Sequence, residues 1–274
     1  MDAHKGPLKL AIAGLGAIGL PVARRVDAGD VAGLALVSVS VRDEAKARKA
    51  MAGFRRPPPL VGLAALAEAA DVIVECLPSQ YFLDVAEPAV TRGRIFMPLS
   101  VGALIDHMQL VEMARKSGAR IVVPTGALLG LDAVRAAAEG KIASATIVTR
   151  KPPAGLAGAP LLAAQGLSVD GLKAPLRVFA GSAREAIAGF PANVNVAVAL
   201  SLAGIGPDRT QVEVWADPGV TRNTHTVTVR SDSSDLTMTI ENIPDTDNPR
   251  TGRITALSVL AALRRLTSPL VVGS

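Results

Sequence analysis

Two groups of residues in this sequence have the types and the spacing that chemistry requires. The first is the glycine pattern Gly14-Leu15-Gly16-Ala17-Ile18-Gly19, which directly follows the apolar run 10–13 (LAIA). The second is His225, which lies in the alternating segment 223–229 (NTHTVTV). Backbone N–H groups after such glycines can hold a phosphate, and an imidazole of ordinary pKa about 6.5 can exchange a proton near neutral pH.

The glycine pattern fits G-x-G-x-x-G and predicts dinucleotide binding. The apolar run before it is typical of a strand buried in a parallel sheet, and an amphipathic helix is expected to follow as far as about residue 27. Gly14 would permit the tight turn, Gly16 the approach of the backbone to a pyrophosphate, and Gly19 close packing of helix on strand. Ala17 and Ile18 would then lie at the positive end of the helix dipole, beside the phosphate. The alternative is a glycine-rich turn that binds nothing.

The end of the second expected strand, 34–41, predicts which dinucleotide is bound. A carboxylate at this point binds the ribose 2′-OH of NAD, whereas an arginine can accept the 2′-phosphate of NADP. Here the strand ends at Val41 and Arg42 follows, with Asp43 one or two places late. We therefore expect NAD or NADP as cofactor, with NADP tolerated and a preference for it left open. The alternative for Arg42 is a solvated loop charge.

Strands and helices alternate up to about residue 130, which predicts a doubly wound parallel sheet. The further strands expected here are 71–76, 95–99 and 120–123, the helices are 63–70, 82–92 and 108–116, and the intervening loops are 76–80, 100–104 and 124–132. Such loops at the carboxyl ends of strands are where α/β sheets bind ligands.

Beyond residue 130 the pattern changes to that of a second sheet. The expected strands are 143–150, 176–180, 211–216, 224–230 and 236–242, and the expected helices are 132–139, 183–188, a helix that starts at Pro191 and runs to 202, and 253–266. The alternation in the last three strands predicts an open, antiparallel arrangement. The fold class is therefore α/β: an N-terminal Rossmann doubly wound parallel sheet plus a C-terminal α/β domain with an open, mostly antiparallel sheet.

Composition narrows the functional classes. The chain has 274 residues, of which 49% are hydrophobic and 19% charged, as expected of a globular protein with a substantial core. Its formal charge is +5, but the basic residues are scattered without interleaved aromatics, so we expect an anionic small molecule and no nucleic acid. No uncharged apolar stretch is long enough to span a bilayer and no signal peptide is expected, which predicts a cytoplasmic protein without a membrane partner. Cys76, the single cysteine, predicts a core residue and no metal site.

Of the three histidines, only His225 has a pattern that suggests chemistry. His4 belongs to a terminus expected to fray, and His107 is expected at the surface. Period-2 alternation puts His225 on the same face as Val227 and Val229. On that apolar face it is either a core histidine with a hydrogen-bond partner or a residue that lines a cleft.

A set of motifs in fixed order resembles the L-aspartate dehydrogenase family over nearly the whole chain. The motifs are GLGAIG at 14–19, EC at 75–76, SVGAL at 100–104, PTGALLGLD at 124–132, TRKPP at 149–153, FPANVNVA at 190–197, NTH at 223–225 and NPRT at 248–251. The pair of motifs around Ala127 and His225 is far more specific than the glycine pattern.

The resemblance implies a Rossmann domain at 1–130, joined by a C-terminal helix at 248–274, and a substrate and dimerisation domain at 131–247. It also implies a homodimer that oxidises L-aspartate with NAD or NADP to oxaloacetate and ammonia through iminosuccinate. By motif match, His225 takes the place of the active-site histidine, and Ala127 and Asn195 take nucleotide-contacting positions. Leu77-Pro78 and Leu128-Leu129 stand where smaller residues are expected.

Several points stay open at this stage. A protonated His225 could bind a substrate carboxylate, and a neutral one could activate the water that attacks the imine. Lys151, Arg222 and Arg250 are candidates for binding the two carboxylates, the alternative being solvated charges. Two rival functions are a related NAD(P)-dependent dehydrogenase or reductase of another small amino or oxo acid, and a non-catalytic NAD(P)-sensing protein.

Overall fold

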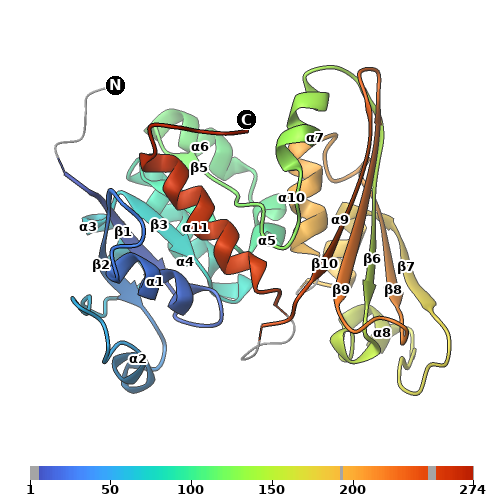
Figure 1. The fold of residues 1–274 in the computed structure, drawn as a ribbon, viewed down its shortest axis with the longest axis horizontal. Coiled ribbons are helices and arrows are strands. Elements are labelled where there is room, and N and C mark those ends of the chain that lie inside the picture. The colour runs from blue at the N-terminus through green and yellow to red at the C-terminus, as the bar shows by residue number, and fades with distance from the viewer. Residues whose placement is uncertain (1–5, 192–193, 246–250, 274) are drawn as a thin grey trace. The chain divides into compact units, whose positions relative to one another are not determined.

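The computed structural model describes residues 6–191, 194–245 and 251–273 (Figure 1). These divide into two compact units: the first runs to Pro124 and includes Ala256–Val271, and the second contains Thr125–Thr255. No helix in these described ranges combines the length and the apolar character that crossing a membrane requires.

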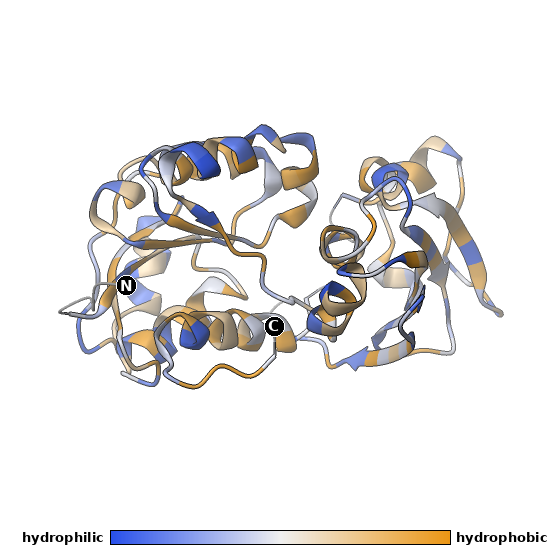
Figure 2. Cartoon of the chain, turned by 90° about the horizontal axis from the view of Figure 1, so that it is seen from above, coloured by the Kyte–Doolittle hydropathy of each residue, from blue (hydrophilic) through white to orange (hydrophobic). Residues whose placement is uncertain are grey.

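The first unit is built on a parallel five-stranded sheet. Its strands, in spatial order, are β2 (Leu34–Ser40), β1 (Leu8–Ala13), β3 (Val72–Glu75), β4 (Ile95–Pro98) and β5 (Arg120–Ile121). Every neighbouring pair is parallel. Helices cover both faces of this sheet, and apolar residues predominate along its strands (Figure 2). The predicted doubly wound parallel sheet is confirmed.

The helices of the first unit include one from the far end of the chain. They are α1 (Gly19–Asp27), α2 (Glu44–Ala50), α3 (Leu66–Ala69), the short 3-10 helix η1 (Ser79–Tyr81), α4 (Phe82–Thr91), α5 (Val101–Asp106), α6 (Gln109–Ser117) and α11 (Ile254–Thr267). Val259 and Leu263 of α11 are fully buried with Leu10 and Ile12 of β1. The hydroxyl of Thr267 donates to the carbonyl oxygen of Ala32 at 2.8 Å, which fixes the end of α11 beside the start of β2.

The second unit contains a mixed five-stranded sheet. Its order is β10 (Asp235–Asn242), β9 (Asn223–Ser231), β6 (Ile142–Lys151), β8 (Gln211–Ala216) and β7 (Leu176–Ser182). Only the β6–β8 pair is parallel, so the predicted open, mostly antiparallel sheet is confirmed. Alternate residues of β9 are buried, as expected when one face of a sheet covers a core.

Short helices supply the rest of that core. They are α7 (Leu131–Ala138), the 3-10 helix η2 (Pro153–Gly155), α8 (Pro160–Ala164), α9 (Ala183–Gly189) and α10 (Asn195–Ala203). Helices α7 and α10 lie on one side of the sheet (Figure 1). Val134 of α7, Leu200 of α10 and Ile147 of β6 are fully buried in the same apolar cluster.

Three local predictions were wrong. Residues 100–104, expected as a loop, begin helix α5, because Val101, Leu104 and Ile105 recur at helical spacing and are buried. Helix α2 was not predicted, although Asp43 caps it by accepting a hydrogen bond from the N–H of Lys46. Helix α10 begins at Asn195 and not at Pro191, which lies in a turn.

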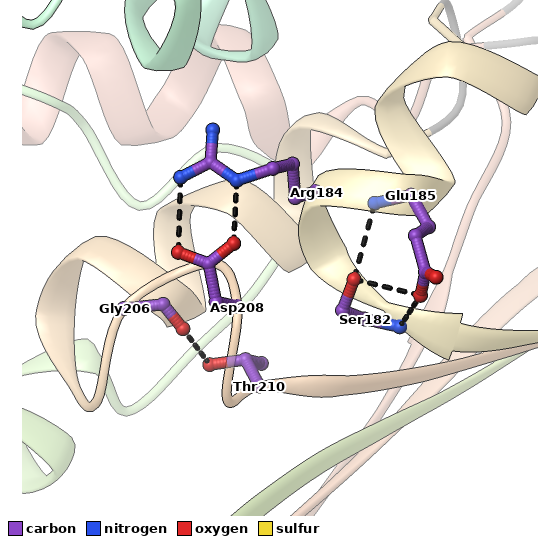
Figure 3. A network of polar contacts seen from close by, with 6 residues as sticks. All are labelled: Ser182, Arg184, Glu185, Gly206, Asp208 and Thr210. Atoms are coloured by element: carbon purple, nitrogen blue, oxygen red, sulfur yellow. Dashed lines mark hydrogen bonds and ion pairs between the residues drawn. The ribbon is translucent and has the colours of Figure 1, made fainter.

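Helix α9 begins with a capping box that joins it to β7 (Figure 3). The Ser182 hydroxyl accepts from the N–H of Glu185 at 3.2 Å, and the Glu185 carboxylate accepts from the N–H of Ser182 at 2.7 Å. The N–H and the hydroxyl of Ser182 both donate to the Glu185 carboxylate and lower the pKa of that group. A bidentate ion pair between Arg184 and Asp208 ties the same helix to the segment before β8.

We expect Ser182→Ala to lower the free energy of unfolding by about 0.5–2 kcal/mol, because the Glu185 N–H loses its partner. Urea unfolding followed by the fluorescence of Trp215 reports on this unit, since the chain has one tryptophan and it lies in β8. Glu185→Gln is the control: its amide oxygen can still accept from the Ser182 N–H, so its loss is expected to be smaller. Equal losses for the two variants would contradict the capping account.

Candidate functional site

The glycine-rich turn connects β1 to α1 through two close approaches. Gly14 has φ of +95°, which disfavours any residue with a side chain, and a Cβ there would lie 2.8 Å from the carbonyl oxygen of Cys76. A Cβ on Gly19 would lie 1.9 Å from the carbonyl oxygen of Gly14. Both positions therefore require glycine for reasons of packing.

Gly16 differs from these two glycines because nothing lies within 4 Å of the position its Cβ would take. It is exposed, and Ala17 and Ile18 after it are half-buried. No side chain caps the start of α1, and the first turn of the helix contains no acidic residue. An uncapped helix start behind an open glycine backbone fits the pyrophosphate of a dinucleotide.

The acidic residues after β2 are engaged in starting α2. The Asp43 carboxylate accepts from the Lys46 N–H at 2.9 Å, and the Glu44 carboxylate accepts from the Arg48 guanidinium at 2.9 Å. Arg42 is exposed at the end of β2 and makes no ion pair with any residue of the described ranges. This arrangement leaves a cation rather than a carboxylate after β2, where dinucleotide-binding folds in general distinguish NAD from NADP.

Cys76 is half-buried at the end of β3 and packs against the core of the first unit. Burial raises the pKa of its thiol well above the ordinary value, and the neighbouring charge of Glu75 raises it further. A thiol of this kind is protonated at neutral pH and a poor nucleophile. His107, expected at the surface, is half-buried and stacks on Phe82 with ring centroids 5.9 Å apart.

His225 lies on the buried face of β9, where 3% of its surface is exposed. Its Nδ1 is 3.0 Å from the hydroxyl oxygen of Thr149, which lies directly opposite on β6. Burial lowers the pKa of His225 to about 3, and the positive charge of Lys151 contributes to the shift. The imidazole is therefore neutral at physiological pH, and of the two alternatives it has the hydrogen-bond partner expected of a buried histidine.

Of the three candidates for binding the substrate carboxylates, Lys151 lies near His225. It occupies the same buried face of β6 as Thr149, two residues further along the strand, and is 5% exposed. Arg222 is exposed before β9, and Arg250 lies outside the described residues. Thr149, Lys151 and His225 thus form a polar cluster on a face that is otherwise apolar.

The two other residues assigned by resemblance also belong to the second unit. Ala127 is half-buried, and its carbonyl oxygen accepts a hydrogen bond from Nδ2 of Asn242 at 3.0 Å. Asn195 is the first residue of α10 and is half-buried. The predicted site residues therefore fall into two sets: the glycine turn and Arg42 in the first unit, and His225, Ala127 and Asn195 in the second.

Thr149 and Asn242 are polar residues of this region to which the sequence analysis gave no role, although Thr149 begins the TRKPP motif. Both are 3% exposed and contact a predicted site residue through a side chain. The signal for Thr149 was available only after the register of β6 and β9 was known, because the contact spans 76 residues.

Comparisons with known proteins cover both units. A family model described as "Aspartate dehydrogenase, C-terminal" matches residues 132–266, and one described as "Homoserine dehydrogenase, NAD binding domain" matches residues 14–124. The L-aspartate dehydrogenase of Bradyrhizobium diazoefficiens is 54% identical over 267 residues, which cover 97% of this chain and 94% of that protein. L-aspartate dehydrogenase 3 of Bordetella bronchiseptica is 55% identical over 267 residues, covering 97% and 98%. The crystal structure of aspartate dehydrogenase from Thermotoga maritima has the same fold, with a TM-score of 0.74 at 23% identity and coverage of 97% and 99%.

A Rossmann-type sheet, a glycine turn before an uncapped helix and the matched NAD-binding model define a dinucleotide-dependent oxidoreductase. Relatives more than half identical over nearly the full length make the assignment narrower. The chain belongs to the L-aspartate dehydrogenase family, and the resemblance of the motifs is confirmed.

The depressed pKa of His225 predicts a specific acid sensitivity. In the folded chain the ring stays neutral down to about pH 3, whereas in the unfolded chain it takes up a proton below about pH 6.5. Between these values the unfolded state binds the extra proton, so the free energy of unfolding falls as the pH falls, and above pH 6.5 this contribution is constant. At pH 5 we expect wild type to have lost about 2 kcal/mol, relative to pH 7.5, that His225→Asn does not lose.

Urea unfolding of both proteins at pH 7.5, 6 and 5, followed by Trp215 fluorescence, measures this difference. The offset between the two proteins at pH 7.5 reports the cavity and the lost hydrogen bond, and only its change with pH reports the histidine. Parallel pH dependences would show that His225 is not held neutral by the fold.

Proposed function

We propose that the protein is an L-aspartate dehydrogenase, which oxidises L-aspartate with NAD or NADP to oxaloacetate and ammonia through iminosuccinate. The observation that carries the proposal is the relationship to L-aspartate dehydrogenases at 54% and 55% identity over 97% of the chain. The uncapped glycine turn and the polar cluster around His225 support it, because the reaction needs a dinucleotide site and a proton acceptor.

When bound, NAD or NADP would supply the acceptor for the hydride that leaves Cα of aspartate. The open backbone of Gly16, with the N–H groups of Ala17 and Ile18, would hold the pyrophosphate, and Gly14 and Gly19 shape the turn that presents it. Ala127 and Asn195 contact the nucleotide by analogy with the family, and Arg42 lies where a 2′-phosphate would be recognised.

His225 is proposed to act as a neutral base that activates the water attacking the imine carbon. Its low pKa supports this role over that of a cation which binds a carboxylate, because a ring of pKa about 3 carries no charge near pH 7. The Thr149 hydroxyl engages Nδ1, so Nε2 is the atom proposed to accept the proton from water. Lys151 supplies the positive charge in this cluster and is the candidate for binding a substrate carboxylate.

We expect His225→Asn to lower kcat/KM for oxaloacetate, in the aspartate-forming direction, by about 10²–10⁴-fold, the usual contribution of a positioned base, while NADPH still binds. The assay follows oxidation of NADPH and of NADH separately, with oxaloacetate and ammonium. His107→Asn is the control, because His107 belongs to the first unit and stacks on Phe82. If turnover of His225→Asn stays within a few-fold of wild type, the catalytic assignment is wrong.

The same assay separates the rival functions. Oxidation that depends on ammonium supports the aspartate dehydrogenase proposal. Activity only with other small oxo acids supports a related dehydrogenase. Tight cofactor binding without turnover of any dicarboxylate supports a non-catalytic NAD(P)-sensing protein.

Arg42→Ala is expected to raise the KM for NADP about tenfold and to leave the KM for NAD nearly unchanged, because only NADP offers a phosphate to the guanidinium. Arg48→Ala, which removes another exposed arginine of the same region, is the control. Equal effects of Arg42→Ala on the two cofactors would contradict recognition of the 2′-phosphate.

A homodimer completes the proposal, on the family resemblance alone, and the cytoplasmic location stays a prediction. Light scattering of the purified protein at micromolar concentration tests the oligomeric state, and a mass of twice 28.1 kDa is expected.

A further inference from the structure

Glu75 is a buried carboxyl group of the first unit that the proposed chemistry does not use. It is the last residue of β3, and none of its surface is exposed. Its side chain accepts hydrogen bonds from three groups: the Leu77 N–H to Oε1 at 2.6 Å, the Ser100 N–H to Oε2 at 3.0 Å, and the Ser100 hydroxyl to Oε1 at 3.1 Å.

These donors come from two different loops of the sheet. Leu77 follows β3, and Ser100 lies between β4 and α5. Both loops leave the carboxyl edge of parallel strands, the edge at which such sheets bind ligands. The Ser100 hydroxyl is also 2.8 Å from the Leu77 carbonyl oxygen, so the two loops contact each other as well as Glu75.

The loop after β3 contacts the glycine turn. A Cβ added to Gly14 would lie 2.8 Å from the Cys76 carbonyl oxygen and 2.9 Å from Cδ2 of Leu77. The position of residues 76 and 77 therefore limits where the backbone of Gly14 can lie. A continuous chain of contacts runs from Ser100 through Glu75 and Leu77 to the first glycine of the turn.

We propose that Glu75 is a positioning residue of the dinucleotide site, which holds the loops after β3 and β4 against the glycine turn without touching the cofactor. The inference rests on the proposed function only in assuming that the glycine turn binds a dinucleotide.

The surroundings require a hydrogen-bond acceptor at both terminal atoms of this side chain. Each carboxyl oxygen accepts from a backbone N–H that cannot reverse its role, Oε1 from Leu77 and Oε2 from Ser100. The single proton of the Ser100 hydroxyl is shared between Oε1 and the Leu77 carbonyl oxygen. A glutamine would turn its NH2 group toward one of these N–H groups, leaving two buried donors face to face. Burial raises the pKa of Glu75, whereas the N–H groups of Ser100, Leu77 and Leu99 and the Ser100 hydroxyl oppose that shift.

The test compares Glu75→Gln with wild type by fluorescence titration of NADPH and NADH. Because the clamped loops are expected to border the nicotinamide half, the intact cofactors should bind about tenfold more weakly. Adenosine 2′,5′-bisphosphate and 5′-AMP, which lack the pyrophosphate bridge and the nicotinamide, should compete with less than twofold change. Glu87→Gln makes the same chemical change at an exposed position of α4 and should alter neither.

Each result has one interpretation. Equal weakening of cofactors and adenosine fragments would overturn the proposal, since it would indicate a general loss of structure in the unit. Unchanged binding of NADPH and NADH by a folded Glu75→Gln protein would overturn it too. If the variant does not fold, Ser100→Ala, which keeps the Ser100 N–H and removes only the hydroxyl, carries the test. It should weaken binding of the intact cofactors by a few-fold, and an unchanged value would overturn the proposal.

Failure of the proposed function is distinguishable from failure of this inference. Wild type that binds NADPH or NADH but catalyses no oxidation contradicts the dehydrogenase and leaves the binding comparison valid. Wild type that binds neither cofactor contradicts both.

Discussion

The close approach of Gly19 to the carbonyl oxygen of Gly14 is the contact on which the first unit depends. A side chain on Gly19 would reach within 1.9 Å of that oxygen, so only glycine allows α1 to begin so near the end of β1. This packing leaves Gly16 exposed with open space beside it and directs an uncapped helix start toward that space. The proposed pyrophosphate site would therefore follow from how helix and strand pack, with no charged side chain needed to create it.

Buried polar groups fix the geometry in both units. Glu75 joins two loops of the first unit, and the Thr149–His225 contact joins β6 and β9 of the second. Each group is surrounded by apolar core, where a lost hydrogen bond costs more than it would in water. A shift of either element would leave such a group without its partner, so these contacts favour a single arrangement of the residues around them. For His225 the same burial also decides the charge, because it removes the water that would stabilise the imidazolium.

The fold class was predicted correctly from the sequence. Individual helices and strands were predicted correctly where their apolar pattern extended over many residues. Buried runs such as 72–75 and alternating segments such as 224–230 have few interpretations other than strands. The errors fell on short segments: α5 has six residues and α2 has seven, and the first was hidden in a motif interpreted as a loop. Asp43 was weighed only as a possible ribose ligand, whereas its carboxylate caps α2, a role that the helix-forming residues after it could have indicated.

The sequence by itself determined the class of this protein, because the spacing of the glycines and the order of the motifs can be recognised without knowledge of any contact. It also placed His225 on the apolar face of its strand through the alternation along that strand, which is a local property. The tertiary structure alone decided that Thr149 lies opposite His225, that Lys151 shares its buried face, and that Glu75 meets Ser100 across 25 residues. These pairings depend on strand register and sheet order, so no local pattern of the chain encodes them. The protonation state of His225 likewise depends on burial by residues distant in the sequence.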